Sequence, residues 1–108
     1  VFDEIGEGVS GIAAQRVAEK LARLSRRKQV ICVTHLPQIA AMADTHFHIE
    51  KRERGGRTYT QVEDLDRQGR KEELARLTGG SHLSQTILEG AEELLQEAEG
   101  YKAEMTAR

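Results

Sequence analysis

Two adjacent carboxylates near the start of the chain are the residues best suited to chemistry. Asp3 and Glu4 lie in the stretch VFDEIGEGVSG, after two apolar residues and before a glycine-rich segment. Neighbouring like charges are costly to desolvate, which disfavours a purely structural pair at a strand end. Acidic strand tips hold Mg²⁺ and orient water in phosphoryl-transfer sites. Because side chains alternate along a strand, Asp3 and Glu4 point in different directions and can have different tasks. Asp3 would hold the hydrated metal, and Glu4 would polarise the attacking water. The alternative is a pair of solvated carboxylates at the border of a strand and a loop.

A histidine further along the chain favours the metal-site interpretation. His35 ends the stretch ICVTH, and the apolar run from Val30 to Val33 predicts a strand that is covered on both faces. An imidazole at that strand end can donate a hydrogen bond to a γ-phosphate oxygen. A lone histidine of this kind is more often a structural loop residue. The Asp-Glu pair and the Thr-His pair together are more specific than either alone.

The segment between these motifs predicts how they are brought together. Residues 10–27 have apolar side chains at helical spacing, with Ser10 as a candidate N-cap and basic residues at the C-terminal end. A strand, a helix and a second strand in succession predict a βαβ crossover. Because ligands of open α/β sheets bind at the carboxyl ends of the strands, both polar strand ends are expected to face one site.

The rest of the chain predicts a short helix, a hairpin and two more helices. Pro37 opens the short helix, with Ile39, Ala40 and Ala43 on its apolar side. Residues 45–51 and 57–65 predict an antiparallel hairpin at the sheet edge, and Arg54-Gly55-Gly56 supplies its turn.

Residues 69–77 predict a charged helix that Gly79-Gly80 terminates. Ser81 is the candidate cap of a final helix, and residues 101–108 are expected to fray. The predicted buried stripe of that helix is Leu83, Ile87, Ala91, Leu94, Leu95 and Ala98.

Composition restricts the classes of protein. The 108 residues suit one small domain or a part of one, and the initial Val with an immediate strand leads us to expect a part. With 38% apolar and 31% charged residues the chain is typical of globular proteins, and its net charge of −2 gives no overall attraction for nucleic acid. Cys32 is the only cysteine, which excludes an internal disulfide and a cysteine-based zinc site. Neither a membrane span nor a signal peptide is evident, so we expect a cytoplasmic protein without a membrane partner.

Three further features carry weaker signals. His46 and His48 share a strand face and could bind a metal, but no third ligand is evident. A basic cluster around the hairpin turn, Lys51 to Arg57, could contact a phosphate, although a solvated charged turn is the favoured account. An exposed apolar face is also expected where the chain lacks a neighbouring lobe.

The stretches VFDEIGEGVSGIAAQRVAEKLARLS, QVICVTHLPQIAAMADTHFHIEK and ELARLTGG resemble the C-terminal part of an ABC-type ATPase head. Within that superfamily they are most similar to the bacterial SMC-like proteins of double-strand-break repair, from Val1 to about Ala98. The resemblance implies an α/β fold: the C-terminal lobe of an ABC/SMC-type P-loop ATPase head, with a parallel βαβ core, an edge β-hairpin and C-terminal helices. Residues 1–108 would then form part of such a head.

The resemblance also implies roles for individual residues. Asp3 matches the Walker B aspartate that holds Mg²⁺ through water, and Glu4 matches the general base of ATP hydrolysis. Gly8, Val9, Ser10 and Gly11 match the D-loop, which reaches across a head–head dimer in this superfamily. His35 matches the switch histidine that senses the γ-phosphate, and Gln38 matches no assigned role. The chain departs from the family pattern at Gly6, where an acidic residue is usual.

Two parts of an ABC-type head do not occur in these residues: a G-x-x-x-x-G-K-[ST] phosphate loop and an LSGGQ-like signature. The resemblance implies that both lie upstream, so the chain alone is expected to be inactive. The chain would complete the head together with an N-terminal lobe of the same protein. Two such heads would form a homodimer that binds ATP and Mg²⁺. The whole protein would act on DNA double-strand-break ends in the nucleoid.

Two alternatives remain open. One is a Mg²⁺-dependent phosphoesterase or receiver-like domain, which needs another Asp or Lys at a strand tip. The other is a non-catalytic module whose hairpin and last helix bind a partner.

Overall fold

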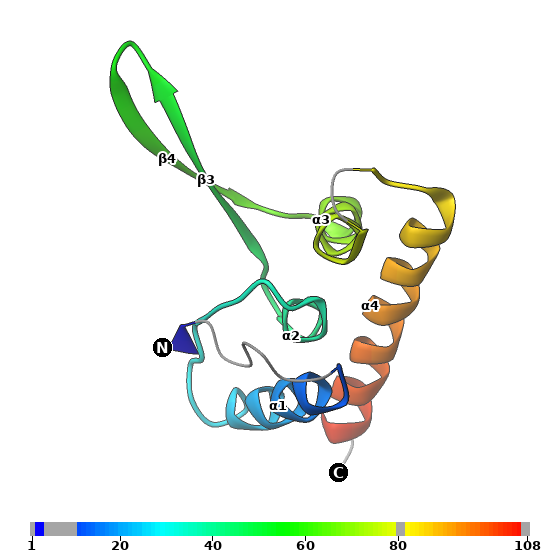
Figure 1. Cartoon of the computed structure of the whole chain (residues 1–108). Coiled ribbons are helices and arrows are strands. Elements are labelled where there is room, and N and C mark those ends of the chain that lie inside the picture. The colour runs from blue at the N-terminus through cyan, green and yellow to red at the C-terminus, as the bar shows by residue number, and fades with distance from the viewer. Residues whose placement is uncertain (1, 4–10, 80–81, 107–108) are drawn as a thin grey trace.

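In the described residues, three helices and two small sheets are arranged around a fourth, short central helix (Figure 1). The computed structural model describes residues 2–3, 11–79 and 82–106. In chain order the described elements are β1 (Phe2–Asp3), α1 (Gly11–Leu24), β2 (Cys32–Val33), α2 (Pro37–Ala41), β3 (Phe47–Arg54), β4 (Arg57–Asp64), α3 (Arg67–Gly79) and α4 (Gln85–Thr106). The mixture of helix and sheet predicted from the sequence is confirmed.

Strands β1 and β2 are parallel, as the crossover pattern predicts. Phe2 pairs with Cys32 and Asp3 pairs with Val33. The prediction of a longer β2 covered on both faces is wrong for the described residues, because β2 contains only Cys32 and Val33. Ile31 is 52% exposed and Val33 is 45% exposed, since no described element covers that side of the strand.

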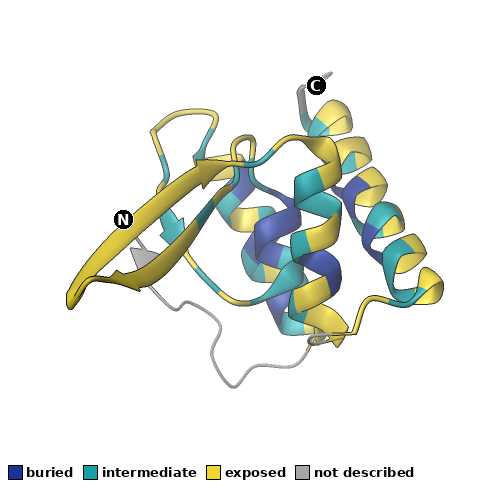
Figure 2. Cartoon of the chain, turned by 90° about the horizontal axis from the view of Figure 1, so that it is seen from above, coloured by how far each residue is buried: buried dark blue, intermediate teal, exposed yellow. Residues whose placement is uncertain are grey.

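Strands β3 and β4 form the predicted antiparallel hairpin. Their register runs from Phe47 opposite Asp64 to Arg54 opposite Arg57. Gly55 and Gly56 have φ angles of 57° and 77°, the left-handed conformation that a two-residue hairpin turn needs and glycine adopts without strain. The predicted place at the sheet edge is wrong, because in the described residues this hairpin is a sheet separate from β1 and β2. It projects away from the helices, and nearly all of it is exposed (Figure 2).

The core lies where the four helices face one another (Figure 2). Eight of the twelve buried apolar residues in the described part of the chain are alanines: Ala14, Ala18, Ala22, Ala40, Ala41, Ala75, Ala91 and Ala98. Small side chains let helices approach closely, and the larger side chains fill the space that remains. Leu74 of α3 and Leu95 of α4 are the large residues with the least exposure. The predicted stripe of α4 is confirmed for Ala91, Leu95 and Ala98.

Helix α2 is fastened at its C-terminal end by two basic side chains. Arg70 of α3 donates from Nη2 to the carbonyl oxygens of Ala41 and Ala43, at 3.2 and 2.9 Å. Lys102 of α4 donates from Nζ to the same Ala43 oxygen and to Asp44 Oδ1, both at 3.1 Å. The last carbonyl groups of a helix lack intrahelical partners, so these contacts satisfy them and add favourable charge.

Helix α1 ends at Leu24, and its chain continues in a turn rather than as helix to Arg27. Helix α3 is longer than predicted at both ends. It begins at Arg67 because Asp66 Oδ1 accepts a hydrogen bond from the Gly69 backbone N–H at 2.7 Å, which is an N-cap.

Helix α4 starts later and ends later than predicted. Ser84 Oγ accepts a hydrogen bond from the Ile87 backbone N–H at 3.2 Å, so the cap is Ser84; Ser81 lies outside the described residues. Leu83 precedes the helix. The prediction that residues 101–108 fray is wrong as far as Thr106, because Tyr101 and Met105 pack against the core and the Tyr101 hydroxyl accepts a hydrogen bond from Arg23 Nε at 2.9 Å.

None of the helices in the described part of the chain combines the length and apolarity needed to cross a membrane.

Leu74 offers a direct test of the core. Replacing this fully buried side chain by alanine (Leu74→Ala) should lower the free energy of unfolding by about 2–5 kcal/mol, through lost burial and the cavity that remains. Leu24→Ala is the matched control, because Leu24 is 37% exposed at the end of α1 and should change stability by less than about 1 kcal/mol. Denaturant unfolding followed by circular dichroism measures both; equal losses would contradict this core.

Candidate functional site

The strand ends that carry the predicted chemistry lie side by side. Asp3 ends β1 and pairs with Val33, which ends β2. His35 follows two residues later, in the loop that leads to α2. Because the strands are parallel, their carboxyl ends share one edge, and Asp3 and His35 approach the same region of the molecule.

Several predicted site residues lie outside the described residues. They are Glu4, Gly6, Gly8, Val9 and Ser10. Gly11 is described, as the first residue of α1. The structure therefore brings together the strand that ends at Asp3 and the strand that leads to His35, whereas Gly11 lies next to Gln38 of α2.

The loop that carries His35 is held on both sides. The Leu36 backbone N–H donates to Thr34 Oγ1 at 3.0 Å, and the Leu36 carbonyl accepts from the N–H groups of Ile39 and Ala40 at 3.2 and 3.1 Å. His35 itself is exposed. These hydrogen bonds fix the backbone on the C-terminal side of an exposed imidazole.

Gln38 is a residue near this site to which the sequence assigned no role. Its Nε2 lies 3.5 Å from the point where a Cβ atom would stand if Gly11 had a side chain. Helix α2 therefore approaches the start of α1. The pocket at this junction is lined by Gly11, Ile12, Gln15, Arg16, Glu19, Gln38 and Leu94. The only sequence signal for Gln38 is its place in the first turn of the helix that follows His35.

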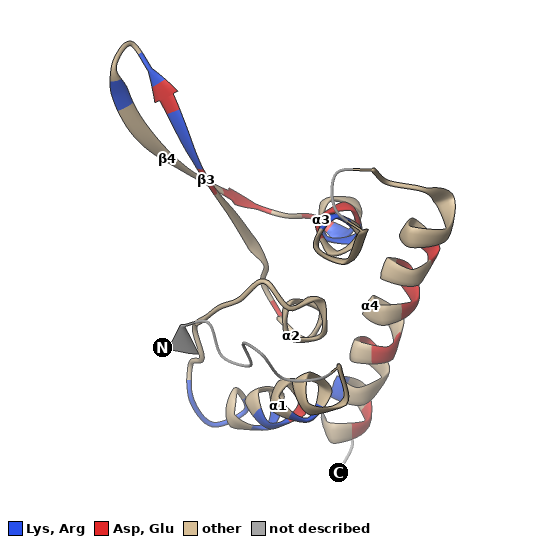
Figure 3. Ribbon diagram, in the orientation of Figure 1, with Lys and Arg blue, Asp and Glu red and all other residues tan. Residues whose placement is uncertain are grey.

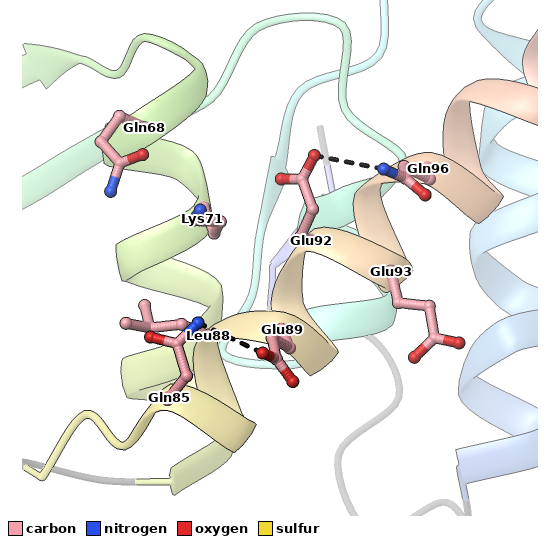
Figure 4. Close-up of a pocket in the computed structure, with 8 residues that line it drawn as sticks. All are labelled: Gln68, Lys71, Gln85, Leu88, Glu89, Glu92, Glu93 and Gln96. Atoms are coloured by element: carbon pink, nitrogen blue, oxygen red, sulfur yellow. Dashed lines mark hydrogen bonds between the residues drawn. The ribbon is translucent and has the colours of Figure 1, made fainter.

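A second pocket, between α3 and α4, is lined almost wholly by polar side chains (Figure 4). The lining residues, of which only Leu88 is apolar, are Gln68, Lys71, Gln85, Leu88, Glu89, Glu92, Glu93 and Gln96. Gln85 donates to Glu89 at 3.2 Å and Gln96 donates to Glu92 at 3.4 Å. No group of three potential metal ligands occurs among the residues the structure describes, so these carboxylates are not assigned a metal.

The two histidines at the base of the hairpin face α3. His48 Nδ1 lies 3.5 Å from Glu73 Oε1, and Glu73 also accepts a hydrogen bond from Arg76 Nε at 3.0 Å. His46 Nδ1 is buried and has no hydrogen-bond partner in the described part of the chain. Burial lowers the pKa of His46, and the positive charge of Arg70 lowers it further. Partial burial raises the pKa of Glu73, but the hydrogen bond and charge of Arg76, together with the charges of His48 and His46, outweigh it and the net shift is downward.

Comparison with known proteins gives close matches along most of the chain, although no protein-family model matches it. The chain is 47% identical over 102 residues to the DNA repair protein RecN of Halalkalibacterium halodurans, and 45% identical over 102 residues to that of Bacillus subtilis; each match covers 94% of the chain. It is 48% identical over 95 residues, or 88% of the chain, to the DNA repair protein RecN of Deinococcus radiodurans. The chain belongs to the RecN family.

The match covers only a small part of each RecN relative. The chain spans 18% of the length of the Halalkalibacterium and Bacillus proteins and 17% of the Deinococcus protein. The features described above are therefore those of one segment of a RecN-type protein.

The lowered pKa of His46 predicts a pH dependence of stability. The folded chain favours the neutral imidazole, so it binds fewer protons than the unfolded chain as the pH falls below the ordinary value of 6.5. The free energy of unfolding should therefore be greatest above pH 6.5 and decrease on acidification toward the pKa of the folded state. Any contribution of Glu73 to the pH dependence of stability falls at a lower pH, because the pKa of Glu73 is shifted below its ordinary value of 4.5.

The His46→Gln variant should lose this decrease, while His82→Gln, at an exposed histidine before α4, should retain it. An NMR titration that gives His46 a pKa of 6.5 or above would contradict the burial argument.

Proposed function

We propose that this chain is the part of a RecN-type ATPase head that supplies the metal-holding aspartate, the general base and the γ-phosphate sensor for DNA repair. The observation that carries the proposal is the parallel register of β1 and β2, with Asp3 opposite Val33 and His35 just beyond. The name of the relatives, DNA repair protein, supports the biological role. A receiver-like domain would need a further Asp or Lys at the end of another strand. The residues that follow β2 are Thr34 and His35 instead.

The parallel strand ends support a magnesium–nucleotide site of this kind. Mg²⁺ keeps several water ligands and is bound through one or two carboxylates together with substrate phosphates. A strand that ends at Asp3 meets that requirement, and a cage of three protein ligands is not needed. When bound, the ion would neutralise negative charge on the phosphates.

The chemistry proposed for the chain's own residues is positioning and proton transfer. Glu4 accepts a proton from the attacking water, and His35 donates a hydrogen bond to an oxygen of the γ-phosphate. Catalysis of phosphoryl transfer rests mainly on such positioning and on electrostatic stabilisation of the transferred group. The short, hydrogen-bonded loop from Thr34 to Leu36 would hold the imidazole in place.

Completion of the site requires other parts of a longer protein. The relatives are several times longer than the chain, which covers 17–18% of them. We propose that an upstream N-terminal lobe brings the phosphate loop and covers apolar side chains exposed on or next to the two sheets: Ile31, Val33, Phe47, Ile49 and Val62. Residues 8–11 would contact the second head of a homodimer, and hydrolysis would open that dimer during the handling of DNA ends.

The role of Glu4 is tested by the Glu4→Gln variant of the full-length protein. Without a base, ATP turnover should fall at least about a hundredfold, while ATP-bound head dimers accumulate. Steady-state phosphate release and size-exclusion chromatography with ATP measure the two effects. Glu7→Gln is the matched control, because it removes a nearby carboxylate that has no proposed role. Turnover at the wild-type rate in Glu4→Gln would exclude the assignment.

The role of His35 is tested by the His35→Ala variant of the same protein. Loss of one hydrogen bond to the γ-phosphate should reduce the turnover number by about ten- to a thousandfold and leave ATP affinity nearly unchanged. His82→Ala, at an exposed histidine remote in sequence, should behave as the wild type. If His35→Ala keeps its turnover number, His35 is only a loop residue.

A further inference from the structure

The hairpin of β3 and β4 presents three arginines on one face near its turn. The register pairs Arg52 with Tyr59 and Arg54 with Arg57. Since side chains alternate along each strand and paired residues share a face, these four residues lie on the same face. All four are exposed. We call this set, Arg52, Arg54, Arg57 and Tyr59, the arginine face.

Positive charge is concentrated at the turn end of the arginine face. Arg54 and Arg57 stand directly opposite each other, and like charges in that position destabilise a hairpin. Arg52 forms an ion pair with Glu50 at 3.0 Å. Neither Arg54 nor Arg57 forms an ion pair within the described part of the chain. A bound polyanion would relieve the repulsion between them.

The shape of the hairpin makes this charge accessible to a large ligand. Figure 1 shows the hairpin projecting from the helices, with its turn at the far end. Eight residues per strand give it a length of about 26 Å. A two-stranded ribbon of this kind fits the major groove of DNA, which is about 12 Å wide. Guanidinium groups match the geometry of phosphate oxygens, and a tyrosine hydroxyl also donates to phosphate.

Basic residues gather in two places of the described chain, near the hairpin turn and around the end of α1 (Figure 3). Figure 3 shows basic residues near the hairpin turn and acidic residues along α4. The glutamates of α4 are Glu89, Glu92, Glu93, Glu97, Glu99 and Glu104. The hairpin as a whole carries four basic and four acidic residues, but three of the basic ones lie at the turn end of one face. A local potential of this kind can guide a polyanion to its contact. Protection of the sheet edge against aggregation needs only scattered charges, and does not require two arginines to face each other.

We propose that the arginine face is a contact surface for the phosphates of duplex DNA. The choice of DNA as the partner rests on the proposed repair function. The contact itself does not depend on ATP hydrolysis, so binding and turnover can be tested separately.

The test measures the salt dependence of DNA binding by the full-length protein without nucleotide. A fluorescently labelled 30-base-pair duplex is titrated with wild type and with the double variant Arg54→Gln/Arg57→Gln, at about 50 to 200 mM salt. Each phosphate contact contributes about 0.9 to the slope of log affinity against log salt concentration, so the slope should fall by about 1.8. Binding at the lowest salt concentration should weaken at least about tenfold.

Two further variants make the comparison specific. Arg26→Gln/Arg27→Gln removes the same charge from the exposed turn after α1 and should keep the wild-type slope. Arg54→Lys/Arg57→Lys keeps the charge and should restore most of the slope. Circular dichroism checks that all variants are folded.

Four outcomes would overturn the inference: no duplex binding by the wild type, an unchanged slope in Arg54→Gln/Arg57→Gln, an equal loss in the control, or a loss confined to single-stranded DNA. An unchanged slope with increased aggregation would identify edge protection as the role of the arginines. If Glu4→Gln retains wild-type turnover while the arginine variant loses duplex binding, the proposed hydrolytic role fails and the DNA contact stands.

Discussion

The position of helix α2 is the constraint on which the rest of the structure depends. This five-residue helix contacts α1, α3 and α4, and its buried residues Ile39, Ala40 and Ala41 lie in the core. It is too short to be stable alone, because a helix gains stability only after a costly first turn has formed. Its stability comes from packing, from the Leu36 carbonyl at its start and from Arg70 and Lys102 at its end. The loop of His35 joins β2 directly to this helix, so the packing of α2 also sets where the imidazole lies.

The helices and the two sheets differ in how far their apolar side chains are buried. The four helices share a continuous core, whereas the hairpin and the β1–β2 pair leave Ile31, Phe47, Ile49 and Val62 at least half exposed. Apolar surface of this kind is typical of interfaces. The helices thus form a common support for the two sheets. In the proposed function, the sheets would present a strand end to the nucleotide, apolar faces to a second lobe and a charged tip to DNA.

The sequence predicted the elements whose signals are local, and it missed features that depend on distant contacts. The parallel pair β1–β2, the hairpin and the Gly55-Gly56 turn follow from apolar runs and turn residues. The caps at Asp66 and Ser84 were missed because several polar residues precede each helix and only packing selects among them. Helix α4 continues to Thr106 because Tyr101 and Met105 reach the core, which no local pattern records. Near the candidate site, the places of Asp3 and His35 at neighbouring strand ends were predictable, although their roles stay predictions. The approach of Gln38 to Gly11 depends on how α1 packs against α2.

The proposed function requires Asp3, Glu4 and His35 to converge on one nucleotide. A structure of the full-length protein, determined with Mg²⁺ and a non-hydrolysable ATP analogue, tests it most directly. The account predicts that Asp3 lies within reach of a metal-bound water, that Glu4 contacts the water in line with the γ-phosphate, and that His35 Nε2 or Nδ1 lies at hydrogen-bond distance, about 2.7–3.2 Å, from a γ-phosphate oxygen. A nucleotide bound elsewhere, with Asp3 and His35 facing solvent in an ordered head, would contradict it.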